Sequence, residues 1–159
     1  IIRKHFADAR FALVAAESGI GEVEAFKERV SSLGLRDAVL WMGRLSKEDM
    51  RAFYDGIDIA VSTHRNEGFG IWALETMAMG RPVAAYRAGG IRDALDGCPS
   101  GFLVDGGPRE LADRVIGLLA DAGAREQAGR EGAAWVRERF GRQRMVDDYE
   151  RHFLTLLRR

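Results

Sequence analysis

Two glutamates lie on either side of a glycine-containing loop near the middle of the chain. Glu67 is followed at once by Gly68 and then Gly70, and seven residues separate Glu67 from Glu75. The loop leads into a helical pattern, and the first backbone N–H groups of a helix have no intrahelical partner. The helix dipole adds partial positive charge there, and glycine has no Cβ atom, so an anion can approach the backbone closely. The pattern indicates a site for a phosphate or diphosphate.

The spacing of the two acids suits a ligand longer than a phosphate. A helix running from Phe69 to Glu75 rises about 9 Å. A diphosphate with a sugar at one end and a ribose at the other spans a comparable length. Because a carboxylate accepts hydrogen bonds from vicinal hydroxyls, we expect Glu67 to meet the sugar and Glu75 the ribose.

Short apolar runs alternate with amphipathic stretches along the whole chain. The apolar runs predict buried strands over residues 10–16, 38–43, 57–62, 82–86 and 101–104. The amphipathic stretches predict helices over residues 19–34, 46–55 and 69–79, a short one after 89–90, and three pieces near 109–121, 124–139 and 142–158. This alternation predicts an α/β fold, a Rossmann-like, doubly wound parallel sheet with a helical C-terminal segment. Ligands of such sheets bind beyond the carboxyl ends of the strands.

Individual residues refine these expectations. Ser46 is the expected N-cap of its helix, with Asp49 as the capping-box acid, and Gly80 ends the helix that follows the loop. Trp41 and Trp72 are expected in the core. The last helix carries an apolar face, for which we expect core packing; the alternative is a membrane-surface helix, which three acids on its polar side disfavour. That face consists of Met145, Val146, Tyr149, Phe153, Leu156 and Leu157.

Bulk composition excludes several classes of protein. The 159 residues are enough for one domain, and 47% apolar with 30% charged residues is a globular balance. A formal net charge of zero disfavours a nucleic-acid partner. Cys98 is the single cysteine, which excludes an internal disulfide, and the histidine spacing is unlike that of a zinc site. No apolar run approaches the length of a membrane span. The chain opens on Ile1, so we expect its true N-terminus to be missing.

An ordered series of motifs accompanies the two acids. The spacing of Glu67 and Glu75, with Gly-Phe-Gly after the first, resembles the E-x7-E signature of family-4-type retaining glycosyltransferases of the GT-B fold. Three later segments resemble further motifs of that family in the same order, and the likeness extends from about residue 8 to residue 155. These segments are Met77–Val83 ("M-A-x-G-x-P-V"), Gly89–Asp93 ("G-G-x-x-[ED]") and Ser100–Val104 ("t-G-x-L-V").

The resemblance implies a role for each matching residue. Glu67 is implied as the catalytic residue beside the donor sugar, at the reacting end, and Glu75 as the ribose ligand. The backbone amides of Gly68, Phe69, Gly70 and Ile71 are implied to hold the sugar hydroxyls and the diphosphate. The strand-end segment of Gly43, Arg44 and Leu45 is implied to lie beside the nucleotide base.

For the whole protein, the resemblance implies a metal-independent hexosyltransferase without a cofactor, which transfers sugar from a nucleotide-diphosphate donor with retention of configuration. Residues 1–159 are then one nucleotide-sugar-binding domain, the C-terminal half of a GT-B fold. Its expected partners are the donor and the absent N-terminal acceptor domain, with no nucleic acid. The expected location is cytoplasmic, with peripheral association of the full-length enzyme at the inner face of the membrane.

One departure from the family pattern affects the expected activity. The family's C-terminal domain opens with a strand followed by Gly-Arg and then Lys, cations that neutralise the diphosphate, and no such element precedes Phe11. We therefore expect the isolated chain to have little or no transferase activity. A non-catalytic nucleotide-sugar-binding module and a GT-B nucleotide-sugar epimerase remain alternatives. A phosphorylase is disfavoured because no lysine stands in a convincing pyridoxal phosphate context.

Overall fold

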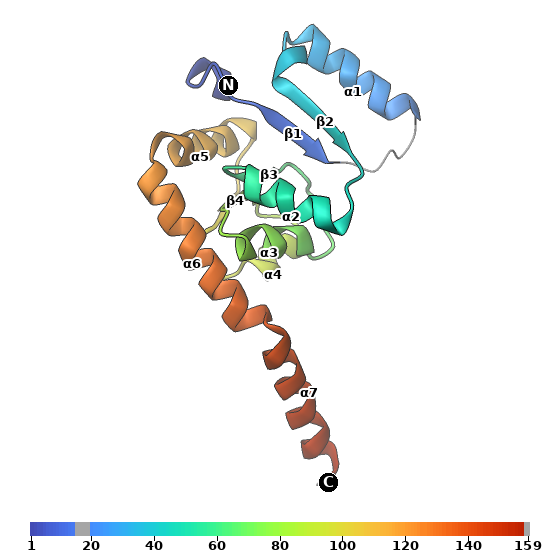
Figure 1. Ribbon diagram of the computed structural model, residues 1–159, viewed down its shortest axis with the longest axis vertical. Helices are drawn as coiled ribbons and strands as arrows, with labels where there is room; N and C mark the ends of the chain where they lie inside the picture. Colours follow the sequence, from blue (N-terminus) through green and yellow to red (C-terminus); the bar gives the residue numbers. More distant parts are fainter. Residues whose placement is uncertain (15–19, 158–159) are drawn as a thin grey trace. The chain divides into compact units, whose positions relative to one another are not determined.

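The computed structural model describes residues 1–14 and 20–157 and divides into two compact units, Ile1–Phe53 and Tyr54–Arg159. The first contains a 3₁₀ turn, η1 (Ile2–Lys4), and a parallel pair of strands, β1 (Phe11–Val14) and β2 (Val39–Gly43). Helix α1 (Ile20–Ser32) and the turn η2 (Arg36–Ala38) connect the two strands. Figure 1 shows α1 beside this pair. Residues 15–19, which include parts of the first expected strand and helix, lie outside the described residues.

Helix α2 (Lys47–Gly56) begins where the sequence predicts, and the division between the two units falls within it. The backbone N–H of Asp49 donates to Ser46 Oγ at 3.1 Å, and Ser46 Oγ donates to the Asp49 carboxylate at 2.7 Å. Ser46 is thus the N-cap. The expected core position of Trp41 is wrong, because its side chain is 42% exposed and packs edge-on against Phe26 on one side.

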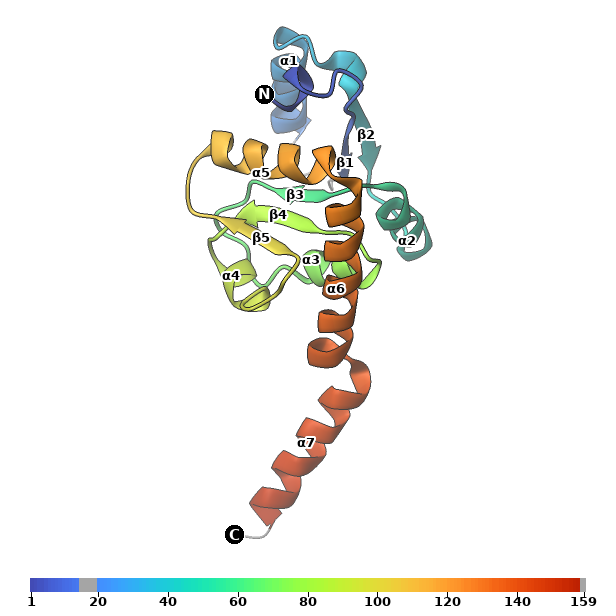
Figure 2. The same cartoon turned by 90° about the vertical axis from the view of Figure 1, so that its left-hand side faces the viewer.

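The second unit is built on a three-stranded parallel sheet in the order β3–β4–β5. These strands are Ala60–Ser62, Val83–Tyr86 and Gly101–Val104. Figure 2 shows α5 (Pro108–Ala120) on one side of this sheet, and α3 (Ile71–Ala78) and α4 (Gly90–Ala94) on the other. All four residues of β4 are buried between these layers. This is the predicted α/β arrangement, in which both faces of a parallel sheet are covered by helices.

Two long helices complete the second unit, α6 (Ala122–Phe140) and α7 (Arg142–Leu157). Helix α6 packs against α3, whereas α7 runs away from the sheet in both views (Figures 1 and 2). The core-packing prediction for α7 is wrong within this chain, because the helix has no buried residue and Leu156 of its apolar face is 50% exposed. No other described segment of the second unit covers that face.

The helix expected over residues 69–79 begins two residues later, at Ile71. The reason is local: Gly70 has φ of +86°, in the left-handed region, so it can precede a right-handed helix but cannot be part of one. The C-terminal boundary agrees with the prediction. Gly80 has φ of +76°, and its N–H donates to the Met77 carbonyl at 2.8 Å. No described helix is long and apolar enough to cross a membrane.

Candidate functional site

The carboxyl end of β3 leads through residues 63–70 into α3, so the predicted loop-to-helix turn is present. Gly70 is the N-cap of α3 and has no side chain that could accept from the first-turn N–H groups. The first amide that bonds back to this cap is that of Ala73, which donates to the Gly70 carbonyl at 2.9 Å. A helix start without a side-chain cap leaves its leading N–H groups to solvent or to a ligand. These groups and the dipole of α3 favour an anion at this end.

A second glycine loop, Gly89–Gly90, packs against the backbone of this turn. The N–H of Gly90 donates to the Glu67 carbonyl at 2.8 Å. A Cβ atom on Gly90 would lie 1.7 Å from the Gly68 carbonyl oxygen, and one on Gly89 would lie 2.6 Å from that of Glu67. Only glycine permits this approach of two backbones. The 89–90 motif found in the sequence therefore fixes the backbone of the loop that carries Glu67.

The opposite side of the turn is open. A Cβ atom on Gly68 would meet nothing within 4 Å, and the side chains of Phe69 and Ile71 are 43% and 64% exposed. Gly70 is buried, and a Cβ there would lie 3.3 Å from Ile91. The turn is thus packed on one face and accessible on the other.

The Glu67 side chain is half-buried and held by two hydrogen bonds. The Trp72 indole N–H donates to Oε2 at 2.9 Å, and the Gly68 backbone N–H donates to Oε1 at 3.1 Å. Trp72 also packs partly against the core beneath α3, as the sequence indicates. Its polar contact with Glu67 was missed, since apolar periodicity says nothing about where an indole N–H points.

Glu75 is the fifth residue of α3, and its side chain is exposed. The hydroxyl of Tyr54, near the end of α2, donates to Glu75 Oε2 at 3.0 Å, although Tyr54 is only 5% exposed. Burial raises the pKa of the Tyr54 hydroxyl well above its usual range, and the hydrogen bond and negative charge of Glu75 raise it further. Tyr54 therefore keeps its proton at neutral pH. Sequence reasoning missed it, because Tyr54 and Glu75 are 21 positions apart.

Other charged groups lie on the loops beyond the strands. The Arg65 guanidinium stacks over the buried ring of Tyr86, with 4.3 Å to the ring centroid. Arg87, directly after β4, pairs with Asp105 at 3.3 Å. Of these two arginines, Arg65 lies on the same loop as Glu67, and its stacking on Tyr86 places a positive charge there. Among the described residues, no group of three or more histidine, cysteine, aspartate or glutamate side chains is arranged to hold a metal ion.

The remaining site residues from the sequence belong to the first unit. Gly43 ends β2 with φ of +63°, and Arg44 and Leu45 follow it before α2. The loop-helix turn with Glu67 and Glu75 belongs to the second unit. The base-side role of Gly43, Arg44 and Leu45 therefore stays a prediction.

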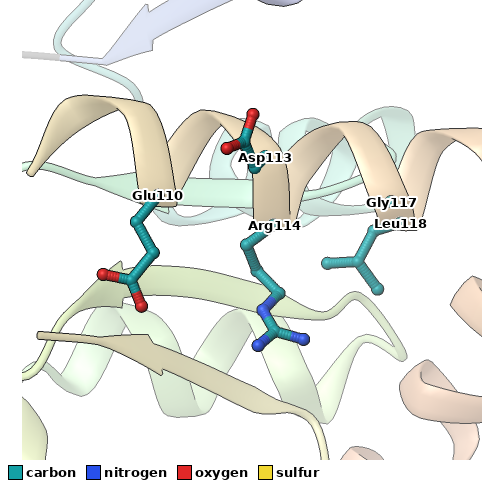
Figure 3. A pocket seen from close by; sticks show the side chains of 5 residues that line it. All are labelled: Glu110, Asp113, Arg114, Gly117 and Leu118. Carbon is teal, nitrogen blue, oxygen red and sulfur yellow. The ribbon is translucent and has the colours of Figure 1, made fainter. Parts of the chain in front are cut away.

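Two shallow hollows occur elsewhere in the second unit. One, of about 320 Å³, is lined by five residues of α5, and Figure 3 shows Glu110 and Arg114 pointing to one side of that helix and Asp113 to the other. Another, of about 450 Å³, lies at the junction of α6 and α7, between Phe140 and Tyr149. Neither hollow includes Glu67 or Glu75.

The comparisons with known proteins agree with the motifs. The family model described as glycosyl transferases group 1 matches residues 1–121. D-inositol 3-phosphate glycosyltransferase of Salinispora tropica is 36% identical over 132 residues, which cover 82% of this chain and 27% of that protein. The protein of the same name from Corynebacterium urealyticum is 36% identical over 105 residues, covering 65% of this chain and 25% of that protein. The chain thus spans about a quarter of the length of these curated relatives.

Solved structures confirm the fold. HepE of Anabaena, in complex with UDP and glucose, has a TM-score of 0.77 and 23% identity, covering 94% of this chain and 43% of that one. Sucrose-phosphate synthase of Thermosynechococcus elongatus has a TM-score of 0.81 and 24% identity, covering 92% and 38%. The C-terminal domain of the group 1 glycosyl transferase LpcC from Francisella tularensis has a TM-score of 0.76 and 24% identity, covering 87% and 73%.

These likenesses confirm the predicted Rossmann-like α/β fold of the GT-B type. Most of the chain matches the family's sequence model, which covers residues 1–121. The chain belongs to the glycosyl transferases group 1 family.

Proposed function

We propose that this chain is the donor-binding part of a retaining glycosyltransferase that transfers a hexose from a nucleotide-diphosphate sugar to an acceptor. One observation carries the proposal: Glu67 and Glu75, each held by an aromatic hydrogen-bond donor, flank a helix start that has no side-chain cap. The relatives named D-inositol 3-phosphate glycosyltransferase and the UDP and glucose bound to HepE support this ligand class.

The proposed chemistry is departure of a diphosphate from the anomeric carbon of the sugar. The amides of Gly68, Phe69, Gly70 and Ile71, with the dipole of α3, would stabilise the charge that develops on the leaving diphosphate. Glu67 would hold the sugar at the reacting end, and Glu75 the ribose. The acceptor's hydroxyl oxygen would bond to the anomeric carbon on the face from which the diphosphate leaves, and its proton would pass to the departing diphosphate, so configuration is retained. The donor site needs neither a metal nor a cofactor in this scheme, because the backbone supplies the electrostatic stabilisation.

In this proposal, another part of the protein binds the acceptor. The chain spans about a quarter of its curated relatives, and the proposed acceptor-binding partner is a further domain of the same enzyme. Transfer then needs both parts, so we expect the isolated 159 residues to bind donor and not to turn it over. A turnover assay on this chain checks that expectation, and robust transfer would refute it.

Calorimetric titration of the complete gene product with UDP-, GDP- and ADP-sugars tests the donor site. We expect one of them to bind, and Glu75→Ala to weaken that binding about tenfold or more, because the ribose hydroxyls lose a charged acceptor. Glu126→Ala is the matched control, since Glu126 is an exposed helix glutamate on α6. Failure of all three donors to bind, or equal effects of the two substitutions, would refute the proposal.

Analysis of the products separates transfer from the alternative reactions. A transferase releases a nucleoside diphosphate and a glycosylated acceptor. A donor returned with an inverted sugar centre would instead identify an epimerase. Binding of a donor without any turnover by the complete gene product would identify a binding module.

A further inference from the structure

Tyr54 connects the buried side of α2 to the exposed acid of α3. Its ring is 5% exposed, and its hydroxyl lies 3.0 Å from Glu75 Oε2. Glu75 itself is exposed on the surface of α3. A buried donor therefore holds a carboxylate that remains accessible to a ligand.

We propose that Tyr54 is a positioning residue, which fixes the Glu75 carboxylate in the orientation that receives the two ribose hydroxyls of the nucleotide. This inference rests on the proposed function, because it deepens the role of Glu75 in donor binding. Tyr54 does not contact the ligand in it and acts only through Glu75.

The physical argument begins with the freedom of an exposed glutamate. Ordering such a long side chain on binding costs about 0.5–1.5 kcal/mol. A hydrogen bond from a rigid, buried phenol selects the orientation before the ligand arrives, and this reduces the cost. A carboxylate offers about four lone-pair positions, and the Tyr54 bond takes one of them. Enough acceptor capacity is left for a pair of vicinal hydroxyls.

The protonation state of Tyr54 supports this role. Burial, and then the hydrogen bond and charge of Glu75, raise the pKa of the phenol, while a hydrogen bond with Thr76 lowers it to a lesser extent. The phenol thus keeps its proton at neutral pH and donates a hydrogen bond to Glu75.

A purely structural role makes a different prediction. A buried phenol needs some hydrogen-bond partner, and a bond to Glu75 could satisfy that need alone. In that case loss of the hydroxyl would alter stability or affect all nucleotides equally. Positioning of Glu75 predicts instead a loss confined to nucleotides that carry ribose hydroxyls.

The experiment compares a ribonucleotide with its 2′,3′-dideoxy form by calorimetry on the complete gene product. UDP, GDP and ADP are titrated first, and the one that binds is used with its dideoxy analogue. The variants are Tyr54→Phe, Glu75→Ala, the double variant, and Tyr149→Phe as the control at an exposed tyrosine of α7. Thermal unfolding of each variant verifies folding.

We expect Tyr54→Phe to weaken ribonucleotide binding about fivefold and to leave dideoxynucleotide binding unchanged. Glu75→Ala abolishes the preference for ribose, and the double variant shows no further loss, because Tyr54 acts through Glu75. If Tyr54→Phe weakens the binding of both nucleotides equally, or of neither, the positioning role is overturned. The proposed function still stands in that case, provided that Glu75→Ala abolishes the preference for ribose. A full ribose preference in Glu75→Ala refutes the proposed ribose contact itself, and with it the role of Tyr54. If Tyr54→Phe fails to fold, Tyr54→His, Glu75→Gln and their double variant are compared instead. If the losses in ribonucleotide affinity of the two single variants add up in the double variant, the positioning role is overturned. If they do not add up, it is supported.

Discussion

At the scale of single residues, each of the two acids of the motif accepts a hydrogen bond from an aromatic side chain. Trp72 donates to Glu67 and Tyr54 donates to Glu75, at 2.9 Å and 3.0 Å. Both donors are rigid aromatic groups that are also anchored by packing. Support of this kind holds functional side chains near one geometry, which lowers the cost of ordering them during binding or reaction.

Trp72→Phe tests the support of Glu67. The substitution removes the N–H donor and keeps an aromatic ring in the same packing environment. We expect kcat for sugar transfer by the complete gene product to fall about tenfold, because a hydrogen bond to a charged group is lost. The affinity for the nucleoside diphosphate should stay unchanged, since Glu67 is proposed to meet the sugar.

Trp135→Phe is the control for this experiment, because Trp135 packs against the same core cluster as Trp72. Steady-state kinetics and nucleotide titrations on both variants give the comparison. A parallel fall in nucleotide affinity and kcat for Trp72→Phe would point to general loosening of the loop and contradict the specific role.

The sequence singles out the two acids as candidates, whose roles stay a prediction, and it does not indicate their hydrogen-bond partners. Residue type and spacing identify Glu67, Glu75 and the glycines between them. The role of Tyr54 becomes visible only from its hydrogen bond to Glu75 in the structure, since long-range contacts leave no periodic signal in one sequence. The apolar pattern predicts that Trp72 packs against the core, but it does not predict the hydrogen bond from its indole N–H to Glu67.

At the scale of elements, glycines of α6 allow this helix to pack closely around the end of α3. A Cβ atom on Gly129 would lie 1.9 Å from the Gly80 carbonyl oxygen, and one on Gly132 would lie 1.9 Å from Ser100 Oγ. Gly80 directly follows Met79, the C-cap of α3, and its N–H donates to the Met77 carbonyl. Close packing at this point therefore fixes the C-terminal end of the helix whose start forms the candidate site.

Gly129→Ala tests this contact. The new methyl group meets backbone, which cannot rotate away, so we expect the free energy of unfolding to fall by about 2–3 kcal/mol. Gly117→Ala is the matched control, because Gly117 lies inside α5 and a Cβ there meets nothing within 4 Å. That variant should gain about 0.5–1 kcal/mol from helix propensity. Chemical denaturation of both variants measures the difference, and equal stability would contradict the packing argument.

Element types and most boundaries follow from periodicity, as β5 shows, whose bounds agree with the predicted residues 101–104. The start of α3 was placed two residues too early, because the positive φ of Gly70 is a property of the folded turn. The sequence shows a glycine at that position, but periodicity does not tell whether it belongs to the loop or to the helix.

At the scale of the whole molecule, α7 carries an apolar face that nothing in the described second unit covers. Met145, Tyr149 and Phe153 are each more than half exposed. The sequence predicted a core face there, since amphipathic periodicity reports that a face avoids water and does not report what it packs against. Only the three-dimensional arrangement shows that the partner is not in this unit.

Leu156→Ser tests this arrangement in the 159-residue chain. Because Leu156 is 50% exposed, we expect a loss of less than about 1 kcal/mol in the free energy of unfolding. Met77→Ala is the comparison, since Met77 is fully buried on the inner face of α3 and its truncation should cost about 3 kcal/mol. Thermal or chemical unfolding checks both values. A cost for Leu156→Ser that equals that of Met77→Ala would mean that α7 packs onto the chain.

The contact between Gly90 and the loop of Glu67 has a mechanical consequence. The Gly90 amide is bonded to the Glu67 carbonyl, and the two backbones leave no space between them. Any shift of this turn would therefore displace the start of α4 as well. If a ligand binds at the turn, we expect the hydrogen exchange of the amides in α4 to become slower. The exchange rates of this short helix would then report whether a ligand is bound.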